Sequence, residues 1–249
     1  MDINQAFKFT SKMIFGGEIG ELGAYKDYLA EAVIGKKGKS QFSGQDIFLT
    51  SDKYAPGARF FDYNKEHGKM AAVLSRPIDA GRIKDIDSLL EAVGEKLVYS
   101  GNKVLGNSHF VENSDNVFDS NYVYSSSIVF ESKYVAYSYI CRESEYAFGL
   151  TSSGVCSTVI RCFYNNTLKR SFECCYGIKS SDCTFCYNII NCSDCLFTFN
   201  VRSKRNMIGN IQLEKGKYAE LKAKLAAELR GELEKGKKLD FSIVDMVRA

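Results

Sequence analysis

The chain has no tryptophan, two prolines and two histidines among its 249 residues. Histidine is the side chain that most often transfers protons or activates a nucleophile near neutral pH. With only His67 and His109 present, most acid-base and nucleophilic mechanisms are excluded. The glycines at Gly16-Gly17 and Gly35 to Gly38 match no P-loop or dinucleotide-binding motif. We therefore expect a protein that is not an enzyme and that carries no cofactor.

Long apolar runs and strong charge of one sign are absent as well. No segment reaches the length of a membrane span, and charges interrupt residues 1 to 15, where a signal peptide would have its apolar core. The net charge of +3 is spread thinly, over basic clusters at Lys36 to Lys39, at Arg202, Lys204 and Arg205, and at Lys235 to Lys238. None carries the interleaved aromatics of single-strand nucleic-acid binders. We expect no membrane partner and a cytoplasmic or virion location, and nothing in the sequence supports nucleic-acid binding.

Aromatic residues are abundant, with 17 Phe and 15 Tyr. Together with the shortage of proline, this composition favours β-strands. The hydrophobic share of 45% and the charged share of 25% are ordinary for a soluble globular protein. At this length the chain can bury a sizeable core, in one large domain or two small ones.

A six-residue repeat dominates the middle of the chain. Residues 102 to 209 divide into eighteen consecutive hexads without an insertion. First positions are mostly small, no fourth position is charged, and Lys204 is the single charged first position. A narrow coil excludes charge and bulk from its lumen, so first and fourth positions face inward. Third and fifth positions, which include Glu112 and Arg142, face outward. This pattern predicts a mainly β, single-stranded β-solenoid.

A longer period limits the possible shapes of the solenoid's cross-section. Tyr122, Tyr134 and Tyr146 recur every twelve residues, and Ser181-Asp182-Cys183 returns as Ser193-Asp194-Cys195. Coils of twelve or twenty-four residues accommodate this period better than triangular coils of eighteen. We therefore favour a two-sided or square solenoid.

The flanking segments define three parts: an N-terminal α+β segment (1–100), the solenoid (101–210), and a C-terminal amphipathic helix with its tail (211–249). Apolar residues from Ile19 to Val33 have helical spacing, whereas the short apolar runs at 47–49 and 59–61 favour strands. A second helix is expected from Ile83 to Leu97, with Asp79 or Asp85 as its cap, and its apolar stripe is placed to cover the open first coil.

The strongest helix signal follows the repeats. Tyr218, Leu221, Leu225, Leu229 and Leu233 form one apolar stripe. The helix either folds back over the last coil or pairs with another subunit. Apolar residues in the final segment, from Phe241 to Val247, also need cover.

The cysteines resemble a zinc site, with Cys183-x-x-Cys186 followed by Cys192-x-x-Cys195. Eight of the nine cysteines, however, occupy first or fourth positions, which are three residues apart by construction. They are Cys141, Cys156, Cys162, Cys174, Cys183, Cys186, Cys192 and Cys195. The preferred interpretation is that these thiols pack the lumen, with metal binding and disulfides as alternatives. We expect no bound metal and a reducing compartment.

Two outward sets are candidate sites. The aromatic and aliphatic set would form a large apolar patch, covered either by residues 1 to 100 or by a partner subunit. Its members are Phe118, Tyr122, Tyr124, Ile128, Phe130, Tyr134, Ile140, Tyr146 and Phe148. The polar set is an outward row that would hold a ligand or act as acids, or would simply be turn residues. Its members are Asp182, Asn188, Asp194, Asn200 and Asn206.

Several motifs resemble those of poorly characterised Cys-rich hexad-repeat solenoid proteins from uncultivated prokaryotes. They are Gly101 to Ser108, the Ser-rich hexads, Cys192-Ser193-Asp194-Cys195, the segment from Arg202 to Asn206, and the helix at Tyr218. The resemblance covers roughly residues 100 to 235. It implies a β-solenoid, and it implies no catalytic residue because these motifs are structural.

The sequence therefore predicts a non-enzymatic structural protein that forms a homo-oligomer, such as a shell, capsid component or filament. Repeated coils offer flat faces, open ends and exposed aromatics, which suit contacts between copies. The alternative is a carbohydrate-active enzyme or carbohydrate-binding module that uses the polar row. No small-molecule ligand is indicated.

Overall fold

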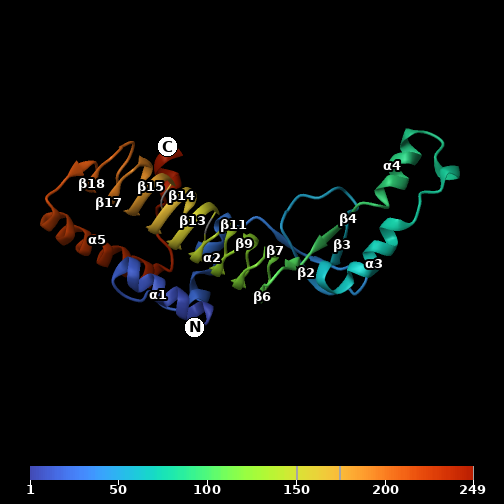
Figure 1. Ribbon diagram of the computed structural model, residues 1–249, viewed down its shortest axis with the longest axis horizontal. Coiled ribbons are helices and arrows are strands. Elements are labelled where there is room, and N and C mark those ends of the chain that lie inside the picture. Colours follow the sequence, from blue (N-terminus) through green and yellow to red (C-terminus); the bar gives the residue numbers. More distant parts are fainter. Residues whose placement is uncertain (150, 174, 249) are drawn as a thin grey trace.

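The computed structural model describes residues 1–149, 151–173 and 175–248. A β-solenoid occupies the middle of the molecule, helices from both ends of the chain lie along one of its sides, and further strands and helices extend from its N-terminal end (Figure 1). The predicted fold class, a mainly β solenoid with an N-terminal α+β segment and a C-terminal helix, is confirmed.

Each turn of the solenoid takes twelve residues. Val135 pairs in parallel with Val123 on one side and with Ala147 on the other, and Cys183 pairs with Cys195. This register confirms the preference for coils of twelve over coils of eighteen. The stacked strands are β5 (Val104–Leu105), β6 (His109–Glu112), β7 (Asp115–Phe118), β8 (Asn121–Tyr124), β9 (Ser127–Phe130), β10 (Lys133–Ala136), β11 (Tyr139–Arg142), β12 (Glu145–Phe148), β13 (Thr151–Ile160), β14 (Phe163–Phe172), β15 (Cys175–Thr184), β16 (Tyr187–Ile190), β17 (Ser193–Leu196) and β18 (Arg205–Ile208).

Two parallel sheets enclose the lumen. One contains β6, β8, β10 and β12, and the other contains β5, β7, β9 and β11. The longer strands β13, β14 and β15 run through both sheets. A short antiparallel partner of β18, β19 (Ile211–Gln212), ends the stack.

Corners recur at every third residue, where the backbone adopts the left-handed conformation. This holds from Phe110 to Gly149 and again from Arg170 to Gly209. Positive φ is uncommon for residues other than glycine and is strained for β-branched ones, yet Ile128 and Ile140 adopt φ values of 59° and 57°. The continuous stack of turns above and below holds these corners in place.

First and fourth positions face the lumen, as predicted. Val117 and Val129 have no exposed surface, and serine fills many first positions. The hydroxyl of Ser126 accepts a hydrogen bond from the backbone N–H of Ser138, one turn on (3.1 Å), and donates to the carbonyl of Tyr124 (2.8 Å). Serine therefore satisfies an inward backbone amide that the sheets leave unpaired.

The N-terminal region departs from the prediction of one helix over Ile19 to Val33. That segment contains only the short turns η1 (Leu22–Tyr25), α2 (Lys26–Leu29) and η2 (Ala30–Ala32). Its apolar side chains are buried because the segment packs on the solenoid. The long helix is α1 (Ile3–Phe15), which the sequence analysis missed. Asp2 caps it in a capping box with Gln5, and Gly16 ends it at φ 72°.

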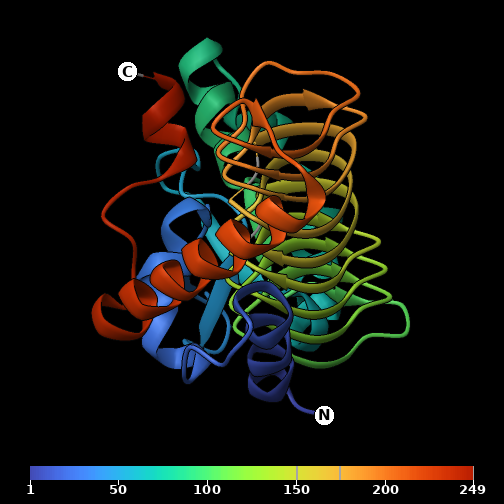
Figure 2. The same cartoon turned by 90° about the vertical axis from the view of Figure 1, so that its left-hand side faces the viewer.

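The predicted C-terminal helix is confirmed as α5 (Lys215–Gly236). It folds back along the solenoid, where it contacts α1 and β18 and buries Tyr218, Leu229 and Leu233 (Figure 2). In the tail, the Phe241 ring packs against Phe185, and the buried Ile243 begins α6 (Ile243–Arg248). The chain itself thus covers Phe241 and Ile243, whereas Met246 is 44% exposed.

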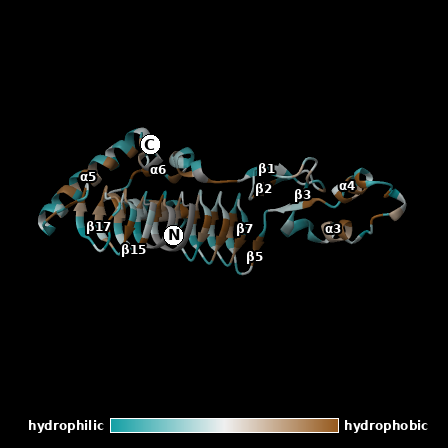
Figure 3. Ribbon diagram, turned by 90° about the horizontal axis from the view of Figure 1, so that it is seen from above, coloured by the Kyte–Doolittle hydropathy of each residue, from teal (hydrophilic) through white to brown (hydrophobic). Residues whose placement is uncertain are grey.

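Residues 36 to 101 form a separate projection at the N-terminal end of the solenoid (Figure 3). Its base is an antiparallel hairpin, β1 (Lys36–Lys39) with β2 (Asp46–Leu49), and a parallel pair, β3 (Arg59–Asp62) with β4 (Val98–Gly101). The predicted strands are confirmed. The part beyond the base, residues 63 to 97, is named the arm and contains α3 (Tyr63–Ser75), η3 (Ala80–Arg82) and α4 (Ile86–Gly94).

The helix predicted from Ile83 to Leu97 is confirmed as α4, and Asp85 caps it. The prediction that its apolar stripe covers the first coil is wrong. The arm points away from the solenoid, and β2 of the base lies beside the first coil instead (Figure 1). Asn102 joins the two, since its side-chain oxygen accepts from Phe48 N and its backbone N–H donates to Phe48 O.

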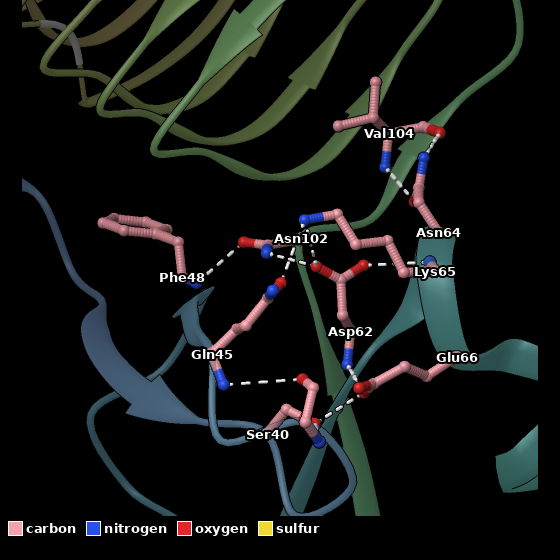
Figure 4. A network of polar contacts seen from close by, with 10 residues as sticks. Ser40, Gln45, Phe48, Asp62, Asn64, Lys65, Glu66, Asn102 and Val104 are labelled. Carbon is pink, nitrogen blue, oxygen red and sulfur yellow. Dashed lines mark hydrogen bonds and ion pairs between the residues drawn. The ribbon is translucent and has the colours of Figure 1, made fainter.

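A buried polar network fixes the base of the arm (Figure 4). Asp62 caps α3 by accepting from Lys65 N, and its other oxygen accepts from the Asn102 amide (2.8 Å). Glu66 accepts from Ser40 Oγ (2.5 Å) and from Asp62 N (2.8 Å). Hydrogen bonding to Ser40, Ser43 and the backbone lowers the pKa of Glu66 against the opposing effect of burial. The arm is therefore anchored by a charged, fully bonded joint.

Candidate interaction surfaces

The nine outward apolar candidates separate into two groups on opposite sheets. Five lie on the sheet of β8, β10 and β12, where the N-terminal segment covers them. Phe7 of α1 meets Phe148 edge-on with ring centroids 5.3 Å apart, and Phe9 lies 5.6 Å from Tyr146. The five covered residues are Tyr122, Tyr124, Tyr134, Tyr146 and Phe148. For this group the cover comes from within the chain.

The other four candidates lie on the opposite sheet, which the terminal helices leave bare (Figure 2). Phe118 and Phe130 stack on successive turns with centroids 6.3 Å apart, and the Arg142 guanidinium lies over the Phe130 ring. Phe118 is 38% exposed, and the exposed Tyr176 and Ile178 lie on the same sheet, three turns beyond Ile140 and four turns beyond Phe130. We name this surface the open face; its residues are Phe118, Ile128, Phe130, Ile140, Tyr176 and Ile178.

A second apolar surface lies on the arm and was assigned to a different role by the sequence analysis. Ile86 and Leu90 are 64% and 61% exposed. Together with Val93 they lie at steps of four and three residues along α4, while Ile83 precedes the helix and Leu97 follows it. These five residues are named the arm stripe. Leu74 of α3 is also exposed. The prediction of an amphipathic helix was therefore correct, but the surface that it was expected to cover was not.

The polar row is not one row, and this corrects the sequence analysis. Since pairing joins residues twelve apart, Asp182, Asp194 and Asn206 belong to one column and Asn188 and Asn200 to another. The Asn188 amide donates to Asn200 Oδ1 at 2.8 Å, and Asp194 pairs with Lys222 of α5. All five residues turn left-handed corners, with φ between 51° and 58°. Asn and Asp tolerate that conformation, which gives the row a backbone explanation.

Four cysteines pack the C-terminal end of the lumen as free thiols. Cys183, Cys186, Cys192 and Cys195 are buried. Sγ of Cys192 donates to Ile190 O (3.3 Å), the same bond to the second-preceding carbonyl that the serines make. In the part of the chain that the structure describes, no three potential ligands converge to hold a metal. The side chains of Cys156 and Cys174 lie outside the described residues.

The surroundings of Cys183, Cys192 and Cys195 favour the protonated thiol. Hydrogen bonding with Cys186, together with burial, raises the pKa of Cys183 well above its usual value. Hydrogen bonding with Cys183 and burial do the same for Cys195, and burial raises the pKa of Cys192. Because metals and oxidants react with the thiolate, the arrangement favours packing over chemistry.

Comparisons with protein-family models, with curated proteins and with solved structures find no match for this chain. The resemblance to Cys-rich hexad-repeat solenoids therefore stays a prediction. Among the described residues, no helix combines the length and the apolar character that a membrane crossing requires. Function has to be argued from the two apolar surfaces and from the charged groups of the solenoid.

Proposed function

We propose that this protein is a non-enzymatic assembly protein, in which the arm stripe of one copy docks on the open face of the next. The observation that carries the proposal is the exposure of the arm stripe. From residue 67 to residue 97, Ala92 is the single buried residue. Ordering a segment costs about 1–2 kcal/mol of backbone entropy per residue, and burial of apolar surface normally offsets it. A docked partner supplies the missing burial.

The chain already contains one contact of the proposed kind, a helix packed on an outer face of the solenoid. Helix α1 lies along the solenoid axis, with Phe7 against Phe148 and Phe15 against Phe172 two turns later. Eight helical residues rise about 12 Å, and two turns of stacked strands rise about 10 Å. A helix that lies parallel to the solenoid axis therefore places one apolar side chain opposite each turn, approximately. Apolar residues on α4 recur about every 5 Å along the helix axis. This spacing is close to that of successive solenoid turns, so they can meet the apolar side chains of the open face turn by turn.

Polar groups around the two surfaces are compatible with this contact. Asp87 and Glu91 flank the arm stripe, and Arg142 lies on the open face. Because the two surfaces are different and the arm points away from its own solenoid, the contact is heterologous. Heterologous contacts produce rings when the rotation closes and filaments when it does not. Both fit a shell or filament component.

Two variants separate the surfaces. The arm variant carries Ile86→Lys and Leu90→Lys, and the face variant carries Phe118→Lys and Ile140→Lys. Ile211→Lys is the matched control, because Ile211 is 64% exposed but belongs to neither surface. We expect the arm and face variants to be monomeric by light scattering while the control assembles like the wild type.

Mixing the two variants tests the pairing directly. Each variant retains one intact surface, so an equimolar mixture should form heterodimers and stop there. If the arm instead paired with another arm, the face variant alone would still dimerise. Monomers in the mixture, from variants that melt like the wild type, would refute the proposed contact.

A further inference from the structure

Lys204 breaks the rule of the repeat, since it is the single charged residue at a first position. Buried first positions such as Ser120, Ser126 and Ser132 face the lumen, where a charge would be severely penalised. Lys204 instead lies exposed at the last full turn of the solenoid, beside Arg205 of β18. The anomaly thus marks a place where the coil presents a lysine to solvent, and the assembly proposal does not account for it.

Lys204 belongs to a cleft of about 530 Å³ along one edge of the last turns. Stacked second positions supply one wall, with Ser181 paired to Ser193 and Ser193 paired to Arg205. Stacked corner residues supply the other wall, where the Asn191 amide donates to Ser203 Oγ (3.2 Å). We name it the basic cleft; its lining residues are Lys179, Ser181, Asn191, Cys192, Ser193, Ser203, Lys204 and Arg205.

The charge of the basic cleft has one sign. Lys179, Lys204 and Arg205 line it, and no carboxylate does. Within the described residues, none of the three has an acidic partner at ion-pair distance, whereas nearby Asp194 is paired with Lys222. Three like charges held together without a counter-charge repel one another, and a bound anion relieves that repulsion.

The neutral groups narrow the class of anion. Hydroxyls of Ser181, Ser193 and Ser203 stand among the cations and can donate hydrogen bonds to the same ligand. Lysine contributes a mobile point charge and arginine a planar fork, a combination suited to the several oxygens of a phosphate. The volume accommodates a phosphate or diphosphate group.

We propose that the basic cleft binds a phosphate group of a small phosphorylated ligand. This inference concerns a part of the solenoid distinct from the arm stripe and the open face, so either proposal can fail without the other. Phosphate can reach the cleft as the free ion or diphosphate, or as the phosphate of a nucleotide, and the test separates these sources.

Titration calorimetry and phosphorus NMR with orthophosphate, diphosphate and adenosine diphosphate test the proposal on the full chain. We expect saturable binding that is strongest for a diphosphate group and weakens with added salt. A triple variant, Lys179→Met with Lys204→Met and Arg205→Met, should lower the affinity at least about tenfold, because it removes all three cations that can make charge-assisted hydrogen bonds to the anion.

The matched control is Lys133→Met, because Lys133 occupies the same second-position column as Arg205, six turns earlier, and lies outside the cleft. It should bind like the wild type. Stronger binding of adenosine diphosphate than of diphosphate would identify a nucleotide as the source, and equal binding the free anion. The proposal is overturned if none of the three probes binds, if the triple variant binds as well as the control, or if only a single-stranded oligonucleotide binds.

The readout also distinguishes binding from folding. All three substituted side chains are exposed, so the variant should keep the melting temperature of the control. In the wild type, diphosphate should shift the backbone amide resonances of Ser193 and Ser203. Shifts confined to residues outside the cleft would also contradict the assignment.

Discussion

The carboxylate of Glu173 lies 3.0 Å from Nε of Arg161, one turn away along the solenoid, and both side chains are buried. The same carboxylate accepts hydrogen bonds from the Tyr28 hydroxyl and from the backbone N–H of Ile243, each at 3.0 Å. One group therefore joins the solenoid, the N-terminal segment and the C-terminal tail.

Replacing Glu173 by Ala should release these three parts from one another. Arg161 would lose its buried partner but keep Glu31 at 2.8 Å, so we expect a loss of about 1.5–3 kcal/mol, the contribution of a hydrogen bond to a charged group, rather than the cost of an unpaired buried charge. Urea unfolding should show that loss, and limited proteolysis should cut the tail after residue 236 more rapidly. Glu143→Ala, at an exposed corner, is the control and should change stability by less than about 0.5 kcal/mol. Equal effects of the two substitutions would mean that the contacts of Glu173 with Arg161, Tyr28 and Ile243 do not stabilise the protein.

A charge in the lumen should unfold the middle turns. Val129 has no exposed surface and is surrounded by other lumen residues, so Val129→Asp buries an unpartnered carboxylate. We expect a loss of at least about 3 kcal/mol in the free energy of unfolding. Glu112→Ala and Lys133→Ala, both on exposed positions, should change it by less than about 0.5 kcal/mol. Comparable losses at all three sites would invert the assignment of inside and outside.

The serine column should be more sensitive to loss of the hydroxyl than to its replacement by a thiol. Ser126→Ala leaves the Ser138 amide without its acceptor and should cost about 1–3 kcal/mol. Ser126→Cys should cost less, because the chain itself places cysteine at equivalent positions with a bond to the second-preceding carbonyl. Chemical denaturation measures both, and an alanine variant as stable as the wild type would contradict the role assigned to the hydroxyl.

The buried thiols make stability fall at alkaline pH. Their folded pKa values are raised, so the folded state keeps protons that the unfolded state releases above about pH 9. Stability is complete below that pH and should decline by up to about 1.4 kcal/mol per pH unit for each such thiol. Replacing Cys183 and Cys195 by Ser should make stability decline less steeply with pH.

The native protein should contain no stoichiometric zinc, which elemental analysis measures. One zinc per chain, lost together with the fold on chelation, would establish a metal site instead.

The inside of the solenoid was predictable because it obeys a local rule. Exclusion of charge from first and fourth positions is visible in the sequence, and the tyrosine period favoured turns of twelve or twenty-four residues, of which the structure has twelve. The left-handed corners also left a signal, the Asn and Asp residues at third positions such as Asn188 and Asp194. That signal was interpreted as a row of ligands, because Asn and Asp both tolerate positive φ and bind cations.

Placement of the flanking elements was not predictable, because an apolar stripe specifies that a face is buried and not what buries it. The stripe from Ile83 to Leu97 was assigned to the first coil and lies on the arm. Helix α1 was missed although Asp2 and Gln5 have the spacing of a capping box. The basic cleft joins Lys179 and Lys204 only after the chain has completed two turns, so no short window of sequence contains it.

The central proposal is that copies of this chain assemble through two different surfaces, the arm stripe of one copy and the open face of the next. Sedimentation velocity of the wild type over a wide range of concentrations tests it most directly. The account predicts a weight-average mass that rises with concentration beyond that of a dimer, without limit for a filament or up to the mass of a closed ring of three or more copies. A single monomeric species at every concentration, or a dimer that grows no further, would contradict it.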